Sequence, residues 1–154
     1  MSTLSKLNLR AAVAVAALAV ALVSPALHAQ WVPERTQAVV PFGFEVGSTH
    51  FGPGTYILSK VGDNVVMIQN GKHSVLTMSS HETSLKPAKT SKVVFYQYGN
   101  HYFLREIWRT GDPEYLRCQE SKDERSLRRE MHDDGRASIP THSDVEVALL
   151  QLPQ

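Results

Sequence analysis

Alternating apolar and polar residues characterise the chain from Gln37 to Arg109. β-Branched and aromatic residues dominate this region, and short turns rich in Gly, Asn and Asp interrupt it, which predicts a series of strands. In the first segment, every second residue from Val40 to Val46 is apolar, so one face is expected to be buried. Pro41 cannot donate a backbone N–H to a ladder, which predicts an edge strand or a bulge there.

Two hairpin turns are predicted from sequence. Asn70-Gly71 favours a type I′ turn, and Gly99-Asn100 separates two strongly β-forming segments. If Gly99 and Asn100 form a two-residue loop, the hairpin side chains divide between two faces. The expected core face carries Val93, Phe95, Tyr102 and Leu104. The opposite face carries Tyr96, Tyr98, His101, Phe103 and Arg105.

The second of these faces is the candidate ligand-binding site. It is aromatic where solvent is expected, and amphipathic rings beside an arginine can stack on a sugar or a peptide. The alternative interpretation buries this face as well, beneath a following helix or against another sheet. Exposure of Tyr98 and Phe103 distinguishes the two interpretations.

A charged segment follows the last predicted strand. From Glu120 to Arg136, 11 of 17 residues are charged, and Ser121 with Glu124 matches a capping box. These features predict a helix over residues 120–132, with Leu127 and Met131 as a narrow apolar contact to the sheet. Residues 137–154 are expected to form a flexible tail, and the alternating Val145-Glu146-Val147 leaves a late strand as the alternative.

The predicted fold is therefore mainly β. We expect one antiparallel β-sandwich or small barrel of about six strands, connected largely as a meander, with one C-terminal helix. The domain is expected to span residues 30–136.

The N-terminus has the pattern of a signal peptide. Lys6 and Arg10 precede an apolar run over residues 11–23, and small residues follow it, with cleavage expected after Ala29 or, alternatively, Ala26. The run is short for a membrane anchor, so residues 1–29 are predicted to be removed, leaving no stable membrane span. The mature protein is expected to be periplasmic or secreted.

Charge and motif content exclude several functional classes. The chain has 16 Lys and Arg against 15 Asp and Glu, and loss of Lys6 and Arg10 leaves a formal charge of −1, which disfavours nucleic acid as a partner. The histidines have no metal-ligand spacing, since Leu85 occupies the position at which a zinc helix beginning at His81-Glu82 would need its second histidine. No Gly-x-Ser-x-Gly elbow is present. We therefore predict no catalytic residues, metal or cofactor.

Cys118 is the only cysteine, so an intramolecular disulfide is excluded. In an exported protein its thiol could form an intermolecular disulfide in an oligomer. The alternative is a small, partly buried residue near the end of the sheet.

Two motifs carry a family resemblance. A Val-Pro-Phe-x-Phe-x-Val-Gly strand begins at Val40, and a Tyr-Gly-x-x-Tyr-Phe-Leu hairpin begins at Tyr98. Over residues 38–132 the chain resembles an uncharacterised family of small exported bacterial β-sheet proteins. The resemblance implies a signal peptide and a compact antiparallel β-domain, and it implies no activity.

Together these features predict an exported, non-enzymatic binding or cell-envelope-associated module. The expected partner is a glycan, a peptide or an envelope component bound by the aromatic hairpin face. One alternative is a carrier of a small apolar ligand, although six strands would enclose little volume. Others are a structural assembly subunit, or an enzyme if His81, Glu82 or Cys118 meet in a deep pocket.

Overall fold

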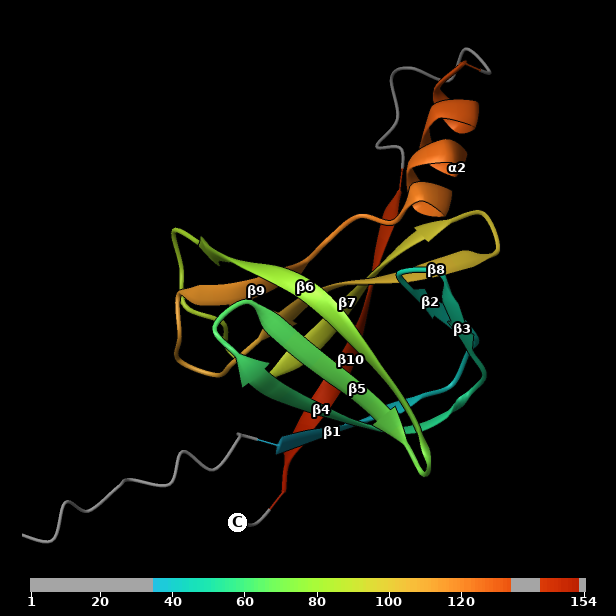
Figure 1. The fold of residues 1–154 in the computed structure, drawn as a ribbon. Coiled ribbons are helices and arrows are strands. Elements are labelled where there is room, and N and C mark those ends of the chain that lie inside the picture. The colour runs from blue at the N-terminus through green and yellow to red at the C-terminus, as the bar shows by residue number, and fades with distance from the viewer. Residues whose placement is uncertain (1–34, 134–141, 153–154) are drawn as a thin grey trace, which may run out of the picture. The chain divides into compact units, whose positions relative to one another are not determined.

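The computed structural model describes residues 35–133 and 142–152, which form ten strands and one helix (Figure 1). The strands are β1 (Arg35–Val40), β2 (Phe44–Val46), β3 (Thr49–Phe51), β4 (Gly54–Gly62), β5 (Val65–Asn70), β6 (His73–Thr83), β7 (Lys92–Tyr98), β8 (His101–Trp108), β9 (Glu114–Cys118) and β10 (Ser143–Gln151). The helix, α2, spans Lys122–Asp133. The prediction of a mainly β fold is confirmed.

Eight of the strands close into an antiparallel barrel. The neighbours run β8-β7-β10-β1-β4-β5-β6-β9, and pairing of β9 with β8 closes the ring. The short β2–β3 hairpin adds to β8 through one parallel pair, Glu45 with Phe103. The predicted count of about six strands was therefore too low. The expected first strand is divided into β1 and β2 around Pro41, and β3, β9 and β10 were not counted.

The connectivity is not a simple meander. β4–β5–β6 and β7–β8–β9 are each joined by consecutive antiparallel pairings, but β9 returns beside β6 and β10 inserts between β7 and β1. β7, β8 and β9 are three consecutive antiparallel strands, and β10 returns beside β7, so these four strands form a Greek key. Residues 143–151 are therefore part of the barrel, so the prediction of a flexible tail is wrong for them, as is the domain boundary at 136.

Two long strands link the two sides of the barrel. β6 pairs with β5 through residues 73–78 and with β9 through residues 79–83. β10 pairs with β7 through residues 143–148 and with β1 through residues 149–151. Strands that pass from one sheet to another make the corners of sheet packings that are intermediate between sandwich and barrel.

The β7–β8 hairpin follows the predicted register from Tyr98–His101 to Phe95–Leu104. Beyond that point Val94 pairs with Glu106 instead of Arg105, because a bulge interrupts the ladder. Only Gly99 of the loop has a positive φ, as in a type II′ turn. The β5–β6 loop is Gly71-Lys72, with positive φ at Gly71 only, so the expected type I′ turn at Asn70-Gly71 is not observed.

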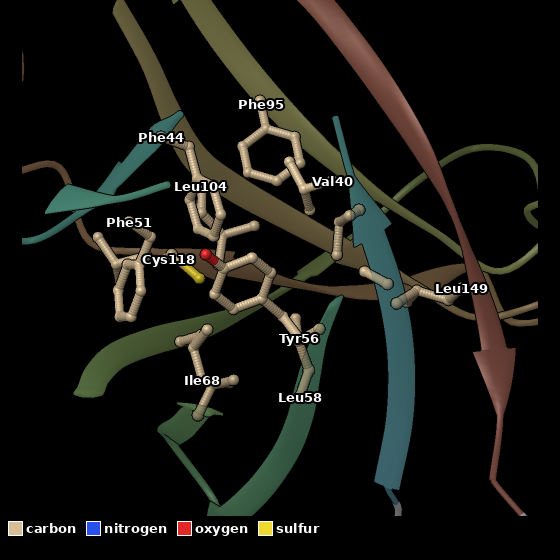
Figure 2. Close-up of a cluster of buried hydrophobic side chains, with 14 residues drawn as sticks. Val40, Phe44, Phe51, Tyr56, Leu58, Ile68, Phe95, Leu104, Cys118 and Leu149 are labelled. Atoms are coloured by element: carbon tan, nitrogen blue, oxygen red, sulfur yellow. The ribbon is translucent and has the colours of Figure 1, made fainter. Parts of the chain in front are cut away.

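Aromatic side chains fill the end of the barrel at which β1 ends and β4 begins. Phe44 lies with its ring centroid 5.1 Å from that of Phe95 and 4.9 Å from that of Tyr56, in both cases edge to face (Figure 2). Phe51 and Phe42 extend the same cluster. The chain between β1 and β4 therefore plugs this end, which we call the plugged end.

Helix α2 begins as predicted. The Glu124 backbone N–H donates to Ser121 Oγ at 3.0 Å, which is the N-cap contact of the expected capping box. Within the described residues, no helix is long and apolar enough to cross a membrane. The predicted signal peptide and its cleavage sites lie outside the described residues.

Candidate functional site

The five predicted ligand-binding residues lie on one outer wall of the barrel, but this wall is largely covered. Tyr98 and Phe103 are only 2% and 3% exposed. Tyr96 and Arg105 are partly buried, and His101 alone is exposed. The interpretation that makes Tyr98 and Phe103 open to solvent is therefore wrong, and the alternative of a buried second face describes them correctly.

The cover over this wall comes from two segments distant in sequence. His142 stacks on Tyr96 with ring centroids 3.9 Å apart. Glu124, in the first turn of α2, accepts hydrogen bonds from Tyr98 Oη at 3.4 Å and from Arg105 Nη1 at 3.1 Å. The helix is therefore attached to the wall by a buried polar contact, whereas Leu127 and Met131 are only half-buried.

Burial alters the acidity of this contact. Burial, together with the nearby Glu124 carboxylate, raises the pKa of Tyr98 to about 12. Burial also raises the pKa of Glu124, although the Arg105 guanidinium opposes that change. The charges of this pair lose hydration on burial, which offsets much of the energy gained from their attraction.

A second carboxylate, that of Glu106, connects three side chains by hydrogen bonds. Glu106, only 9% exposed, accepts hydrogen bonds from Tyr96 Oη at 2.9 Å, Trp108 Nε1 at 2.8 Å and Arg117 Nη2 at 3.1 Å. Trp108 in turn stacks on Tyr115 with ring centroids 4.0 Å apart. Because the Tyr96 hydroxyl and the Trp108 ring N–H both donate to Glu106, these two groups already have hydrogen-bond partners within the protein.

Cys118 lies in the core, where it is 1% exposed and pairs in register with Ser79. Burial raises the pKa of the Cys118 thiol to about 12. In this conformation the sulfur cannot reach a second chain, so the possible intermolecular disulfide is not supported. The alternative of a small core residue describes Cys118 correctly.

We expect Cys118 to resist thiol reagents in the native protein. With a pKa of about 12, roughly one thiol in 10⁴ is ionised at pH 8. Burial also keeps the reagent away from the sulfur atom. Addition of 5,5′-dithiobis(2-nitrobenzoate) should label one thiol per chain in guanidinium chloride and almost none within minutes without denaturant. Rapid stoichiometric labelling of the native protein would contradict the buried position.

The residues considered for an enzymatic pocket do not converge. Along the β6–β9 pairing, His81 lies opposite Leu116, Glu82 opposite Tyr115, and Cys118 faces the core. In the part of the chain that the structure describes, no three His, Cys, Asp or Glu residues are grouped as they would be to hold a metal ion.

The barrel has a cavity of about 220 Å³ at the end opposite the plug. This open end lies where β4 and β8 end and where β5 and β9 begin. Four apolar side chains from four strands line the cavity: Leu58, Val66, Ile107 and Leu116. Polar side chains also line it: Thr36, Ser59, Lys60, His81, Arg109, Asp112, Glu114 and Tyr115. Polar residues therefore outnumber apolar ones in the lining, and the volume is below the range of about 300–1,000 Å³ that is usual for ligand pockets.

Neighbouring groups already hold the acidic residues of this cavity. Asp112 Oδ1 accepts the backbone N–H of Glu114 at 2.9 Å. Glu114 Oε2 lies 3.9 Å from His81 Nδ1, and the other ring nitrogen of His81 lies 3.0 Å from the Asp63 carbonyl oxygen. A more open recess of about 600 Å³ shares Arg109 and Asp112 with the cavity.

This cavity is formed by segments that lie far apart in the sequence. Its lining comes from six strands and the β8–β9 loop. The four apolar residues lie on four different strands, and pairing of these strands brings them together. The alternation within each strand indicates which residues face inward, but only the closed topology shows that they meet at one end.

Comparison of the chain with protein-family models, with curated proteins and with solved structures gave no match. The resemblance to an exported bacterial family therefore stays a prediction, and the case for a function depends on the geometry of the barrel.

Proposed function

We propose that this protein is an exported, non-enzymatic binding protein that holds a small, largely apolar molecule in the open end of its barrel. The observation that carries the proposal is the cavity of about 220 Å³, whose accessible apolar lining is the half-buried Ile107 and Leu116; Leu58 and Val66 also line it but are only 4% and 2% exposed. Export is proposed from the signal-peptide pattern of residues 1–29.

The strand number supports a carrier over the hairpin-face binder. Six strands would enclose little volume, whereas eight can either fill their interior with side chains or hold one small ligand. Here the aromatic cluster fills one end and leaves space at the other. Tyr98 and Phe103, the central rings of the hairpin face, are buried and present almost no surface to a partner.

The cavity is slightly larger than those known to bind single aromatic rings. An apolar cavity of about 150 Å³ admits benzene, so about 220 Å³ suits one ring with a short substituent. Burial of such a molecule corresponds to a dissociation constant of about 1 mM or tighter.

We expect 2-phenylethanol to bind the mature protein, and Leu116→Trp to abolish this binding by filling the cavity. Leu150→Trp is the matched control, because Leu150 is 60% exposed and lines neither recess. Isothermal titration calorimetry measures binding, and circular dichroism verifies that both variants fold. Equal binding by Leu116→Trp and Leu150→Trp would contradict the proposal, as would no binding by the wild type.

A further inference from the structure

Lys60 differs from the other charged residues of the cavity. It is half-buried near the end of β4, and it lines the cavity beside Leu58 and Val66. Among the residues that the structure describes, no carboxylate lies within salt-bridge distance of its ammonium group. The cation therefore has no direct ion-pair partner among these residues.

The local backbone explains the position of Lys60. The β4–β5 ladder is irregular between Lys60 and Gly62, where Val61 is the extra residue. Bulges of this kind change the direction of side chains and are common beside binding sites. The ladder is regular up to Lys60, so alternation along the strand places Lys60 on the same face as Leu58.

The two carboxylates of the cavity keep their negative charge, but neither lies within salt-bridge distance of the Lys60 ammonium group. Asp112 is held by the Glu114 backbone N–H, and Glu114 lies beside His81. A partly buried cation loses some of its hydration. A charge-assisted hydrogen bond to an anion compensates for that loss. An anionic group on the ligand can supply this partner while the rest of the molecule contacts the apolar walls.

We infer that the natural ligand of this cavity is a small carboxylate with one ring or a short hydrocarbon chain, whose anionic group pairs with Lys60 at the open end of the barrel. This inference rests on the proposed function and specifies its ligand class. In the bound state the apolar body lies among Leu58, Val66, Ile107 and Leu116, and the carboxylate accepts hydrogen bonds from the Lys60 ammonium group. No covalent step is involved.

The size of the cavity restricts the hydrocarbon portion. A volume of about 220 Å³ accommodates a phenyl ring with a short side chain, but a long acyl chain would extend into solvent. Phenylacetate is a suitable probe, and 2-phenylethanol is its uncharged counterpart with nearly the same shape.

The experiment compares these two probes by isothermal titration calorimetry on the mature protein. Phenylacetate is expected to bind about tenfold more tightly than 2-phenylethanol, since a charge-assisted pair adds to the same apolar contact. Lys60→Met keeps an unbranched side chain and removes the charge, so it should bring the ratio of the two dissociation constants from about ten to about one. Lys72→Met is the control, because Lys72 is exposed in the turn at the opposite end of the barrel.

The outcomes separate this inference from the proposed function. If both probes bind equally to the wild type, or if Lys60→Met keeps the preference for phenylacetate, the inference is wrong although the cavity still binds ligands. If neither probe binds, the proposed function fails and the inference fails with it. A preference lost in Lys60→Met and retained in Lys72→Met supports the inference.

Discussion

Truncation of the chain after His142 is expected to abolish cooperative folding. The deletion removes β10, which lies between β7 and β1 and pairs with both. Leu149 is a buried core residue, and Val145 and Val147 contact the core as well. Loss of β10 opens the barrel and leaves the edges of β1 and β7 unpaired. The free energy of unfolding of a domain is only about 5–15 kcal/mol, so the domain is not expected to tolerate this loss.

The control is a chain lacking only residues 153–154, which should unfold like the full-length protein. Far-ultraviolet circular dichroism and urea titration measure both variants. A chain ending at His142 that retains the full-length transition would show that residues 143–151 are the dispensable tail expected from sequence.

Phe95→Ala is expected to destabilise the protein by about 3–5 kcal/mol. Phe95 is 1% exposed, and its ring lies in edge-to-face contact with Phe42 and Phe44, with centroids 5.2 and 5.1 Å away. The substitution removes these contacts and leaves a void in the plugged end, which neighbouring rigid rings cannot fill completely.

Val39→Ala provides the comparison, because Val39 is 57% exposed on the outer surface of β1. Its cost should be about 1 kcal/mol or less. Urea unfolding gives both free energies, and equal losses for the two variants would contradict the position of the aromatic cluster.

Local features of the chain were predictable from sequence. The β7–β8 hairpin was found because Gly99-Asn100 and the flanking alternation act over a few residues. The start of α2 was found because Ser121 and Glu124 form a contact within one helical turn.

Features that depend on distant segments were not predictable. The alternation along β7 and β8 leaves both burial and exposure of Tyr98 and Phe103 open, and only the fold shows that Glu124, 26 residues from Tyr98 in sequence, contacts Tyr98. β10 was mistaken for a flexible tail because its apolar alternation is short and its partners, β1 and β7, are remote in sequence. The cavity was missed for the same reason, since no single segment contains its walls.

The buried pair of Arg105 and Glu124 gives the covered wall a defined role. It connects α2 to the barrel through charged groups that are 12% and 2% exposed, instead of through a broad apolar contact. Such a pair favours one orientation of the helix over others, because any displacement leaves a buried charge without its partner. The hairpin face is therefore best described as the attachment site of α2, and the open end of the barrel is the site that we propose for a ligand.

The most direct test of a ligand-binding barrel is to map the bound molecule by nuclear magnetic resonance. Titration of ¹⁵N-labelled mature protein with 2-phenylethanol should produce saturable amide shifts at Leu58, Val66 and Leu116, and none at the distant turns of Gly71 and Gly99. Shifts confined to the outer wall around Tyr96, or no saturable shifts at any residue, would contradict it.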